Sequence, residues 1–172
     1  MDKNKKKFSK LYDKNVNKIY RFIFLKVDSS ETAEDLTSRV FSKAWDKFKT
    51  KEEAKKVKNP SAYIFQIARS EIAHYYRKKP EFNIISADSL QIADQNQNLE
   101  QKEKNRAEIA EVINALRKLS EEEQNIVIWR YLEGMSYKKI AEITGKKEGT
   151  VRVMVHRALK SLKKVMEEKE NL

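Results

Sequence analysis

The stretch from Gly145 to Ala158, GKKEGTVRVMVHRA, places basic, hydrogen-bonding and small apolar side chains at helical spacing. If the buried stripe of this helix runs through positions 151, 155, 158 and 162, the opposite side carries Arg152, Val153, His156 and Arg157. In the DNA major groove, Arg pairs bidentately with guanine and small apolar groups meet the thymine methyl. The stretch therefore predicts a helix that could read DNA bases. The alternative is a plain helical hairpin with a solvated basic face.

A short helix just before this stretch would position it. Ser136 is predicted as the N-cap of that helix, whose apolar residues are Ile140, Ala141 and Ile143. Gly145 can supply the positive φ that ends it, and the next helix should begin near Glu148. The buried positions of this second helix are predicted to be Val151, Val155, Ala158 or Leu159, and Leu162. A helix, a glycine-containing turn and a second helix are the signature of a helix-turn-helix.

Residues that could perform catalysis are not grouped in the sequence. The two histidines, His74 and His156, lie in different predicted modules, and no glycine-rich phosphate loop occurs. The carboxylates show no metal-ligand or catalytic pattern, and cysteine is absent, which excludes disulfides and Cys-type zinc sites. We therefore expect no enzyme activity, no catalytic residue, no metal and no cofactor.

The charge balance favours a polyanionic partner. The 172 residues carry a formal charge of +11, with 37% charged and 40% apolar residues and only three glycines. Nucleic acid, the transcription or translation machinery and an anionic membrane are all compatible with this charge. The N-terminal stretch lacks the apolar segment of a secretory signal, and no run approaches the about 18 apolar residues of a membrane span. We expect a cytoplasmic protein.

Residues 8–79 show the apolar periodicity of amphipathic helices. The first stripe comprises Phe8, Leu11, Tyr12, Val16, Ile19, Phe22 and Ile23. Ser30 is predicted as the next N-cap, followed at four-residue steps by Leu36, Val40, Ala44 and Phe48. The lysine-rich KTKEEAKKVKN is expected to be a loop or a frayed helix end. Asn59 should then cap a helix that starts at Pro60 and stops at Pro80, with an apolar stripe of Ile64, Phe65, Ala68 and Ile72.

Residues 81–101 differ from both flanks, because they contain four acidic residues and no Lys or Arg. They predict a flexible linker with room for a short helix. Helical periodicity resumes near Asn105 with Ile109, Val112, Ile113, Leu116 and Leu119. SEEE at 120–123 fits a capping box, after which Ile126, Val127 and Tyr131 are expected to face inward. The predicted fold is all-α: two small helical domains, 1–80 and 106–172, joined by a flexible acidic linker, 81–105.

Three blocks, in this order, resemble the extracytoplasmic-function (ECF) sigma factors of bacterial RNA polymerase. AEDLTSRVFSKAW (33–45) is similar to a helix of their second conserved region, and NPSAYIFQIARSEIAHYYRKK (59–79) to the helices that follow. LSEEEQNIVIWRYLEGMSYKKIAEITGKKEGTVRVMVHRALKSL resembles their fourth region. The resemblance implies a sigma region 2 bundle and a sigma region 4 helix-turn-helix.

The resemblance also implies the roles of particular residues. The residues expected to bind core polymerase are Asp35, Ser38, Arg39, Ser42 and Trp45. Those expected to bind the single-stranded −10 element are Lys56, Lys58, Asn59, Ser61, Arg69, Ser70, His74, Arg77 and Lys78. Those expected to bind the −35 element are Lys146, Lys147, Thr150, Arg152, Val153, His156 and Arg157. For Trp45, packing at the edge of the core is an alternative role. For Tyr63, Tyr75 and Tyr76, both base stacking and core packing remain open.

The implied function is promoter-specific transcription initiation under stress. The implied partners are core RNA polymerase, promoter DNA as duplex and as non-template single strand, and an anti-sigma factor that could be membrane-bound, with no small-molecule substrate. Ser38 and Arg39 stand where the family usually has Gln and Glu, and Val153 replaces a frequent Ser. A free-standing helix-turn-helix regulator is the rival hypothesis, but such a protein has no reason to carry the 33–79 block.

Overall fold

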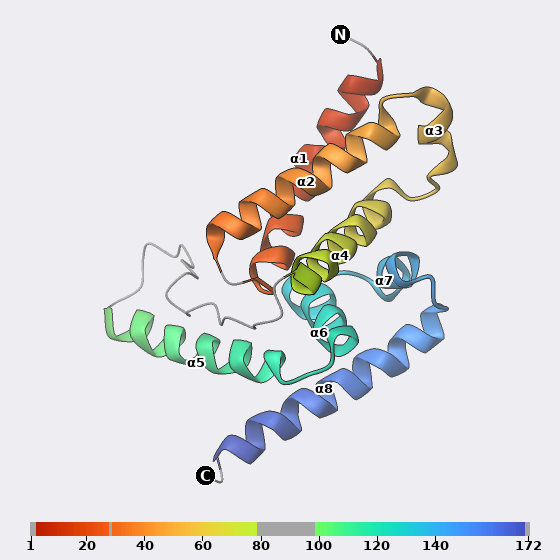
Figure 1. The fold of residues 1–172 in the computed structure, drawn as a ribbon. Helices are drawn as coiled ribbons and strands as arrows, with labels where there is room; N and C mark the ends of the chain where they lie inside the picture. Colours follow the sequence, from red (N-terminus) through yellow and green to blue (C-terminus); the bar gives the residue numbers. More distant parts are fainter. Residues whose placement is uncertain (1–2, 28, 79–98, 171–172) are drawn as a thin grey trace. The chain divides into compact units, whose positions relative to one another are not determined.

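The computed structural model describes residues 3–27, 29–78 and 99–170, and every regular element in these ranges is helical (Figure 1). The helices are α1 (Lys3–Phe24), α2 (Ser30–Phe48), α3 (Lys51–Lys56), α4 (Pro60–Lys78), α5 (Leu99–Arg117), α6 (Glu121–Val127), the π-helix η2 (Ile128–Leu132), α7 (Tyr137–Thr144) and α8 (Glu148–Glu170). The predicted all-α class is confirmed. In these ranges no helix combines the length and apolar character needed to cross a membrane.

The described residues form two compact units. The first contains α1 to α4, the second contains α5, α6, η2 and α8, and α7 is divided between them. The assignment of domains to 1–80 and 106–172 stays a prediction. The part of the expected linker from 81 to 98 lies outside the described residues, whereas residues 99–105 belong to α5.

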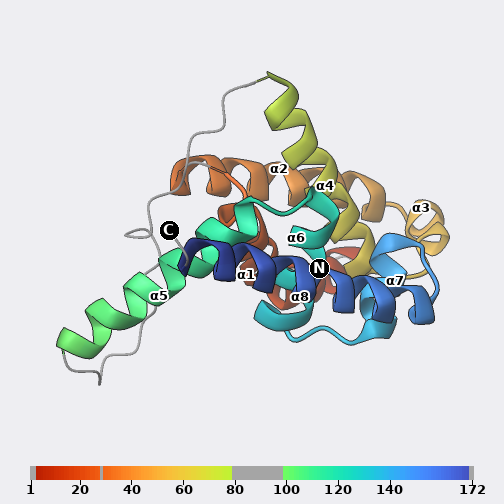
Figure 2. The ribbon, with the colours of Figure 1, turned by 90° about the horizontal axis from the view of Figure 1, so that it is seen from below.

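The first unit is built around α2, which packs against both α1 and α4 (Figures 1 and 2). The four-residue stripe of α2 is buried as predicted, with Leu36 at 2% and Val40 at 0% exposure. The predicted stripe of α4 is equally buried, and Phe65 of that stripe meets Phe22 of α1 with ring centroids 5.9 Å apart. Side-chain burial along these stripes is the main stabilising contribution to the unit.

The local start signals of the first unit are partly as predicted. Asn59 caps α4, because its Oδ1 accepts the backbone N–H of Ala62 at 3.0 Å. The N-cap of α2 is Ser29 rather than the predicted Ser30, since the Ser29 hydroxyl accepts the N–H of Thr32 at 3.1 Å. Two adjacent serines are equivalent as caps, so the buried stripe could not distinguish them.

The segment expected to be a loop or a frayed end contains the short helix α3. Thr50 caps it, and its Oγ1 accepts the N–H of Glu53. Glu53 also forms ion pairs with Lys47 and Lys56. These contacts, led by the hydrogen bond from Lys47, lower the pKa of Glu53 to about 2. None of the residues of α3 is buried, so its helicity comes from the cap and these local pairs rather than from an apolar stripe.

The second unit depends on a capping box at the start of α6. The Ser120 hydroxyl accepts the N–H of Glu123 at 3.3 Å, and the Glu123 carboxylate accepts the N–H of Ser120 at 3.0 Å. The predicted capping box is thus confirmed. The other oxygen of Glu123 accepts a hydrogen bond from Ser161 of α8 at 2.6 Å, so one carboxylate caps α6 and holds α8 beside it.

The end of α6 departs from the predicted pattern. Ile126 and Val127 are buried as expected, but Tyr131 is 51% exposed and the prediction for it is wrong. The chain continues as the π-helix η2, in which Glu133 N–H donates to the carbonyl of Ile128 at 3.0 Å. The wider turn of a π-helix changes the angular position of later residues. Trp129, the second residue of η2, is buried at 1% exposure.

Glu71 of α4 is a buried carboxylate whose partner sequence periodicity does not reveal. It is 3% exposed and pairs with Lys43 of α2, whose side chain is 61% exposed. We expect Lys43→Met to lower the free energy of unfolding by about 1–3 kcal/mol, because the carboxylate then stays buried without its cation. Urea unfolding of the purified variant measures the change.

Lys49→Met is the matched control, because the Lys49–Asp46 pair is exposed at both ends and should contribute less than about 1 kcal/mol. Replacing both partners, as in Lys43→Met with Glu71→Leu, should recover much of the loss. Equal unfolding midpoints for the Lys43 and Lys49 variants would contradict this account.

The contact between Glu123 and Ser161 predicts a pH-dependent stability. Hydrogen bonds from Ser161 and then Ser120 lower the pKa of Glu123 below its ordinary value of 4.5. The folded state therefore holds this proton less tightly than the unfolded state, so the contribution is complete above pH 4.5 and is lost as the pH falls through the folded pKa. Ser161→Ala should cost about 1 kcal/mol at neutral pH and clearly less near pH 3. Urea unfolding at both pH values tests this, and an equal difference at both would contradict it.

Candidate nucleic-acid and partner interfaces

The helix-turn-helix forms from local signals that the sequence carries. Ser136 caps α7, because its hydroxyl accepts the N–H of Lys139 at 3.1 Å. Gly145 follows α7 with φ of 70°, a left-handed conformation that suits glycine. Its N–H donates to the carbonyl of Ala141 at 2.8 Å. The predicted cap and the predicted glycine turn are both confirmed.

The α8 helix has one buried and one exposed side. Val151, Val155 and Ala158 are 0–3% exposed, whereas Leu159 is 36% exposed, so Ala158 rather than Leu159 occupies the buried position. The opposite side exposes the expected readers Arg152, Val153, His156 and Arg157, with Val153 at 50%. The expected residues of the helix start, Lys146, Lys147 and Thr150, are exposed as well. A continuous polar surface with one apolar residue therefore runs along the first half of α8.

Two cations of this surface have partners within the second unit. The Arg152 guanidinium donates to Glu148 at 3.1 Å and lies over the ring of Tyr137, 4.5 Å from its centroid. Lys146 forms an ion pair with Glu122 of α6, with a nitrogen–oxygen distance of 3.4 Å. Glu148, Tyr137 and Glu122 were not among the expected site residues. The four-residue spacing of Glu148 and Arg152 could have indicated their pair, but the other two contacts depend on the tertiary fold.

On α2, the residues expected to contact polymerase share the side opposite the buried stripe. Asp35, Ser38, Arg39 and Ser42 are all exposed, and Asp35 pairs with Arg39 at 2.9 Å. Trp45 is half-buried, and its ring lies 5.1 Å from that of Phe8 between centroids. Packing at the edge of the core, the alternative considered for Trp45, is thus observed, while its role in binding polymerase stays a prediction.

The residues expected at the −10 element lie on α4, at its start and at the end of α3. Lys56, Lys58, Ser70, His74, Arg77 and Lys78 are exposed, and Asn59, Ser61 and Arg69 are half-buried. The side-chain oxygen of Asn59 is engaged in capping. The hydroxyl of Tyr76 donates to the carbonyl of Lys26, which favours a packing role for this tyrosine.

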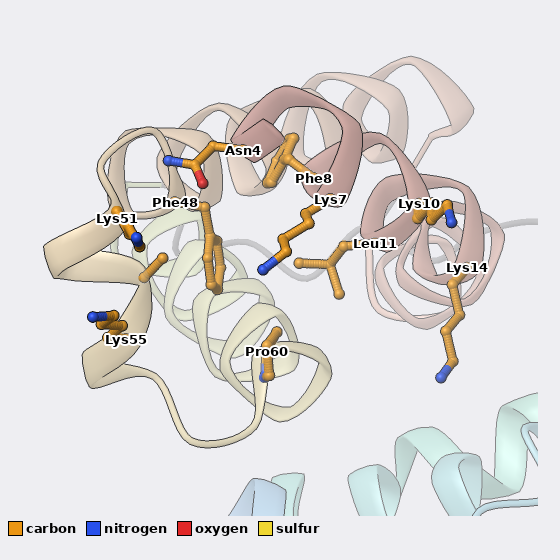
Figure 3. A pocket seen from close by; sticks show the side chains of 11 residues that line it. Asn4, Lys7, Phe8, Lys10, Leu11, Lys14, Phe48, Lys51, Lys55 and Pro60 are labelled. Carbon is orange, nitrogen blue, oxygen red and sulfur yellow. The ribbon is translucent and has the colours of Figure 1, made fainter. Parts of the chain in front are cut away.

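A pocket of about 460 Å³ opens beside this surface, between α1, α3 and the start of α4 (Figure 3). Its apolar lining consists of Phe8, Leu11, Phe48, Ala54 and Pro60, and its basic lining of Lys7, Lys10, Lys14, Lys51 and Lys55. In Figure 3 the side chain of Lys7 extends between Phe48 and Leu11. Among the residues that the structure describes, no carboxylate forms an ion pair with any of these five lysines. The pocket thus combines an apolar floor with uncompensated positive charge.

Two family models match the chain, and each covers one of the helical modules. Sigma-70 region 2 matches residues 11–80, and sigma-70 region 4 matches residues 107–162. Together they account for more than half of the 172 residues. The modules therefore define a protein of the sigma-70 class. A free-standing helix-turn-helix regulator does not account for the region 2 match.

Curated relatives narrow this class. The ECF RNA polymerase sigma factor BldN of Streptomyces coelicolor is 28% identical over 160 residues, which are 92% of this chain and 60% of BldN. The ECF sigma factor SigM of Bacillus subtilis is 27% identical over 154 residues, 89% of this chain and 91% of SigM. The chain belongs to the ECF sigma factors, as its resemblance predicted. Sigma factors are initiation factors rather than enzymes, in agreement with the expected lack of catalysis.

Solved structures support the fold independently. The sigma factor RpoE of Bartonella quintana, determined in complex with the anti-sigma factor NepR, matches with a TM-score of 0.68 and 23% identity, over 94% of this chain and 98% of RpoE. CnrH, determined in complex with the cytosolic domain of CnrY, matches with a TM-score of 0.66 and 16% identity, over 96% of this chain and 91% of CnrH. At these identities the likeness concerns the fold.

A substitution of Lys147, at the start of α8, is predicted to stabilise the fold but to weaken the electrostatic part of DNA binding. Lys147 holds the N-cap position, because its carbonyl accepts the N–H of Val151 at 3.0 Å, but its side chain cannot accept a hydrogen bond. Lys147→Ser should raise the free energy of unfolding by about 1 kcal/mol. The same change should reduce the salt slope of DNA binding by about 1 if the lysine contacts phosphate. Urea unfolding and binding titrations over a range of salt concentrations measure the two effects, and a less stable variant would contradict the cap argument.

Proposed function

We propose that this chain binds core RNA polymerase in the cytoplasm and directs promoter-specific initiation by recognising the −35 and −10 elements and melting the latter. One observation carries the proposal: a helix-turn-helix with an exposed reading face stands in one chain with a module that matches sigma-70 region 2. A duplex reader and a single-strand binding module on one chain suit a protein that must both locate and open a promoter.

The −35 element is assigned to the exposed side of α8. Arg152 and Arg157 can donate to guanine, and Val153 can meet a thymine methyl. His156 lies between them on the same side, and Lys147 and Thr150 precede them near the phosphate backbone. The buried stripe of Val151, Val155 and Ala158 supports this orientation, because it leaves the opposite side free for the major groove.

The −10 strand is assigned to the surface formed by α3 and α4. The exposed cations Lys58, Arg77 and Lys78 would neutralise phosphates, and Ser70 and His74 would contact an unstacked base. The pocket beside α3 supports the same assignment, since its apolar floor suits a base and its five lysines suit a polyanion. Lys56 should contribute less to this charge, because Glu53 already pairs with it.

The exposed side of α2, which includes Asp35, Ser38, Arg39 and Ser42, is assigned to core polymerase. In such a complex Asp35 and Arg39 would exchange their mutual ion pair for contacts with polymerase. The interface would therefore depend more on complementary charges than on apolar burial. We also assign this chain an anti-sigma factor as partner. The assignment is supported by RpoE and CnrH, whose structures were determined with NepR and with the cytosolic domain of CnrY.

Reconstitution tests the proposed function. The purified chain is added to core RNA polymerase with a library of promoter fragments, and transcripts are sequenced from their 5′ ends. Initiation at defined sites that require the chain is the expected result. Tight binding to promoter duplex without core, together with no directed initiation, would support an independent regulator and overturn the proposal.

Arg157→Ala tests the reading face within the same assay. If Arg157 contacts a base, its loss should weaken use of the upstream element by about 1–3 kcal/mol and relax selectivity at one base pair. Lys164→Ala, on the exposed side of the same helix about two turns further along, should leave selectivity unchanged. Unchanged upstream preference in the Arg157 variant would place this side chain on phosphate or in solvent.

A further inference from the structure

Tyr137 lies at the centre of a charged cluster that precedes the reading face. It is the first residue of α7, and its ring lies under two guanidinium groups. The Cζ of Arg130 is 4.4 Å from the ring centroid, and the Cζ of Arg152 is 4.5 Å from it. Both distances are well within the range in which a cation and an aromatic face attract each other. The ring of Tyr137 thus already has two cationic partners within the protein itself.

Arg130 anchors this cluster to the fold. Its Nη1 donates to the carbonyl of Met135 at 2.9 Å, which ties the guanidinium to the loop between η2 and α7. Met135 is itself buried, at 2% exposure. The ring of Tyr137 therefore rests against a cation that is fixed by backbone. Arg152, in contrast, has a side chain that is 60% exposed and can reach a ligand.

Glu148 provides the second contact to Arg152. The two residues are four apart on α8, and the guanidinium nitrogen lies 3.1 Å from the carboxylate oxygen. Glu148 opens the helix, where a negative side chain also interacts favourably with the helix dipole. An arginine otherwise samples many rotamers, but here one side of the guanidinium meets a ring and one edge meets a carboxylate.

We propose that Tyr137 and Glu148 are positioning residues that set the selectivity of Arg152 for one base pair of the upstream promoter element. The inference rests on the proposed function and adds to it two residues that the reading face does not contain. Tyr137 holds the guanidinium plane in place, so less conformational freedom is lost when Arg152 meets a base.

Glu148 acts through charge. Its carboxylate neutralises Arg152 in the free protein and would repel a nearby phosphate, so attraction to DNA of any sequence is reduced. A guanine at the right position offers Arg152 two acceptors, whereas another base leaves Arg152 paired with Glu148 and the carboxylate close to DNA. Selectivity therefore comes both from the contact of Arg152 with guanine and from Glu148, which disfavours binding to other sequences.

The experiment uses the complex of the full chain with core polymerase. Its binding to promoter fragments with a randomised upstream element is measured by sequencing the bound fraction, at two salt concentrations. The variants are Arg152→Ala, Tyr137→Leu, Tyr137→Phe, Glu148→Gln and the double variant Tyr137→Leu with Arg152→Ala. Glu168→Gln is the matched control, because Glu168 also pairs with a lysine on α8 at a spacing of four residues, but about 30 Å along the helix from Glu148.

The expected outcome is a loss of preference at the base pair that Arg152→Ala identifies. Tyr137→Leu should reduce discrimination there about two- to fivefold, and Tyr137→Phe should retain it because the aromatic face is kept. Glu148→Gln should reduce discrimination at the same base pair while it increases binding to all sequences and their salt dependence. The double variant should discriminate at this base pair as well as Arg152→Ala alone does, since the tyrosine acts through the arginine.

Three results would overturn the inference: full discrimination in Tyr137→Leu, an equal loss at every position of the element, or additive losses in the double variant. An equal loss would indicate a purely structural role, and additive losses would indicate a direct contact of Tyr137 with DNA. Failure of the proposed function would give a different result: the unmodified chain would confer no sequence preference on core polymerase.

Discussion

The structure depends on helices that bury one side and present the other to a partner. In α2 the residues at positions 36, 40, 44 and 48 are buried, and the exposed residues of the opposite side are those assigned to polymerase. In α8 the buried stripe of Val151, Val155 and Ala158 fixes which residues face outward. Successive residues of an α-helix are about 100° apart, so a slip of one residue would replace the entire exposed set. The packing of one side of each helix against the core therefore also determines which residues the other side presents to a partner.

The buried stripe determines which side of α8 faces the core, but it does not by itself fix how α8 lies against α6. The carboxylate of Glu123 provides a contact that does. It caps α6 through Ser120 and accepts from Ser161 on α8 at 2.6 Å, so the start of one helix and the middle of another share one group. A second pair, Lys146 with Glu122, joins the beginning of α8 to the first turn of α6. The two contacts lie 15 residues apart in the sequence, one just before α8 and one within it, and together they restrict how α8 lies against α6. Polar groups thus complete the positioning that apolar burial begins.

Features that depend on a few neighbouring residues were predictable from the sequence. Asn59, Ser120 and Ser136 are caps, and Gly145 is a left-handed turn, because each uses hydrogen bonds or dihedral freedom within four residues. Tyr131 was wrongly expected to be buried, since the π-helix changes the period on which that expectation relied.

Other features could not be predicted because they join distant segments. The partner of buried Glu71 is Lys43, which is 28 residues away, and the Arg152 guanidinium lies over a ring 15 residues earlier. The exposed sides of α2 and α8 followed from periodicity, but the partners of their charged residues did not. Periodicity identifies which residues are available for recognition, whereas tertiary contacts determine which of them are free.

That distinction bears on how a strongly basic chain can remain selective. With a formal charge of +11, the protein is attracted to any nucleic acid, and this attraction carries no sequence information. On the reading face, however, Arg152 and Lys146 are neutralised by Glu148 and Glu122, while the lysines around the pocket of the first unit have no described carboxylate partner. Part of the positive charge is thus compensated where bases are proposed to be read, whereas the lysines around the pocket, where a single strand is proposed to be held, lack such pairs among the described residues. A surface that must discriminate benefits from weak general attraction, and a surface that must retain an opened strand benefits from strong attraction.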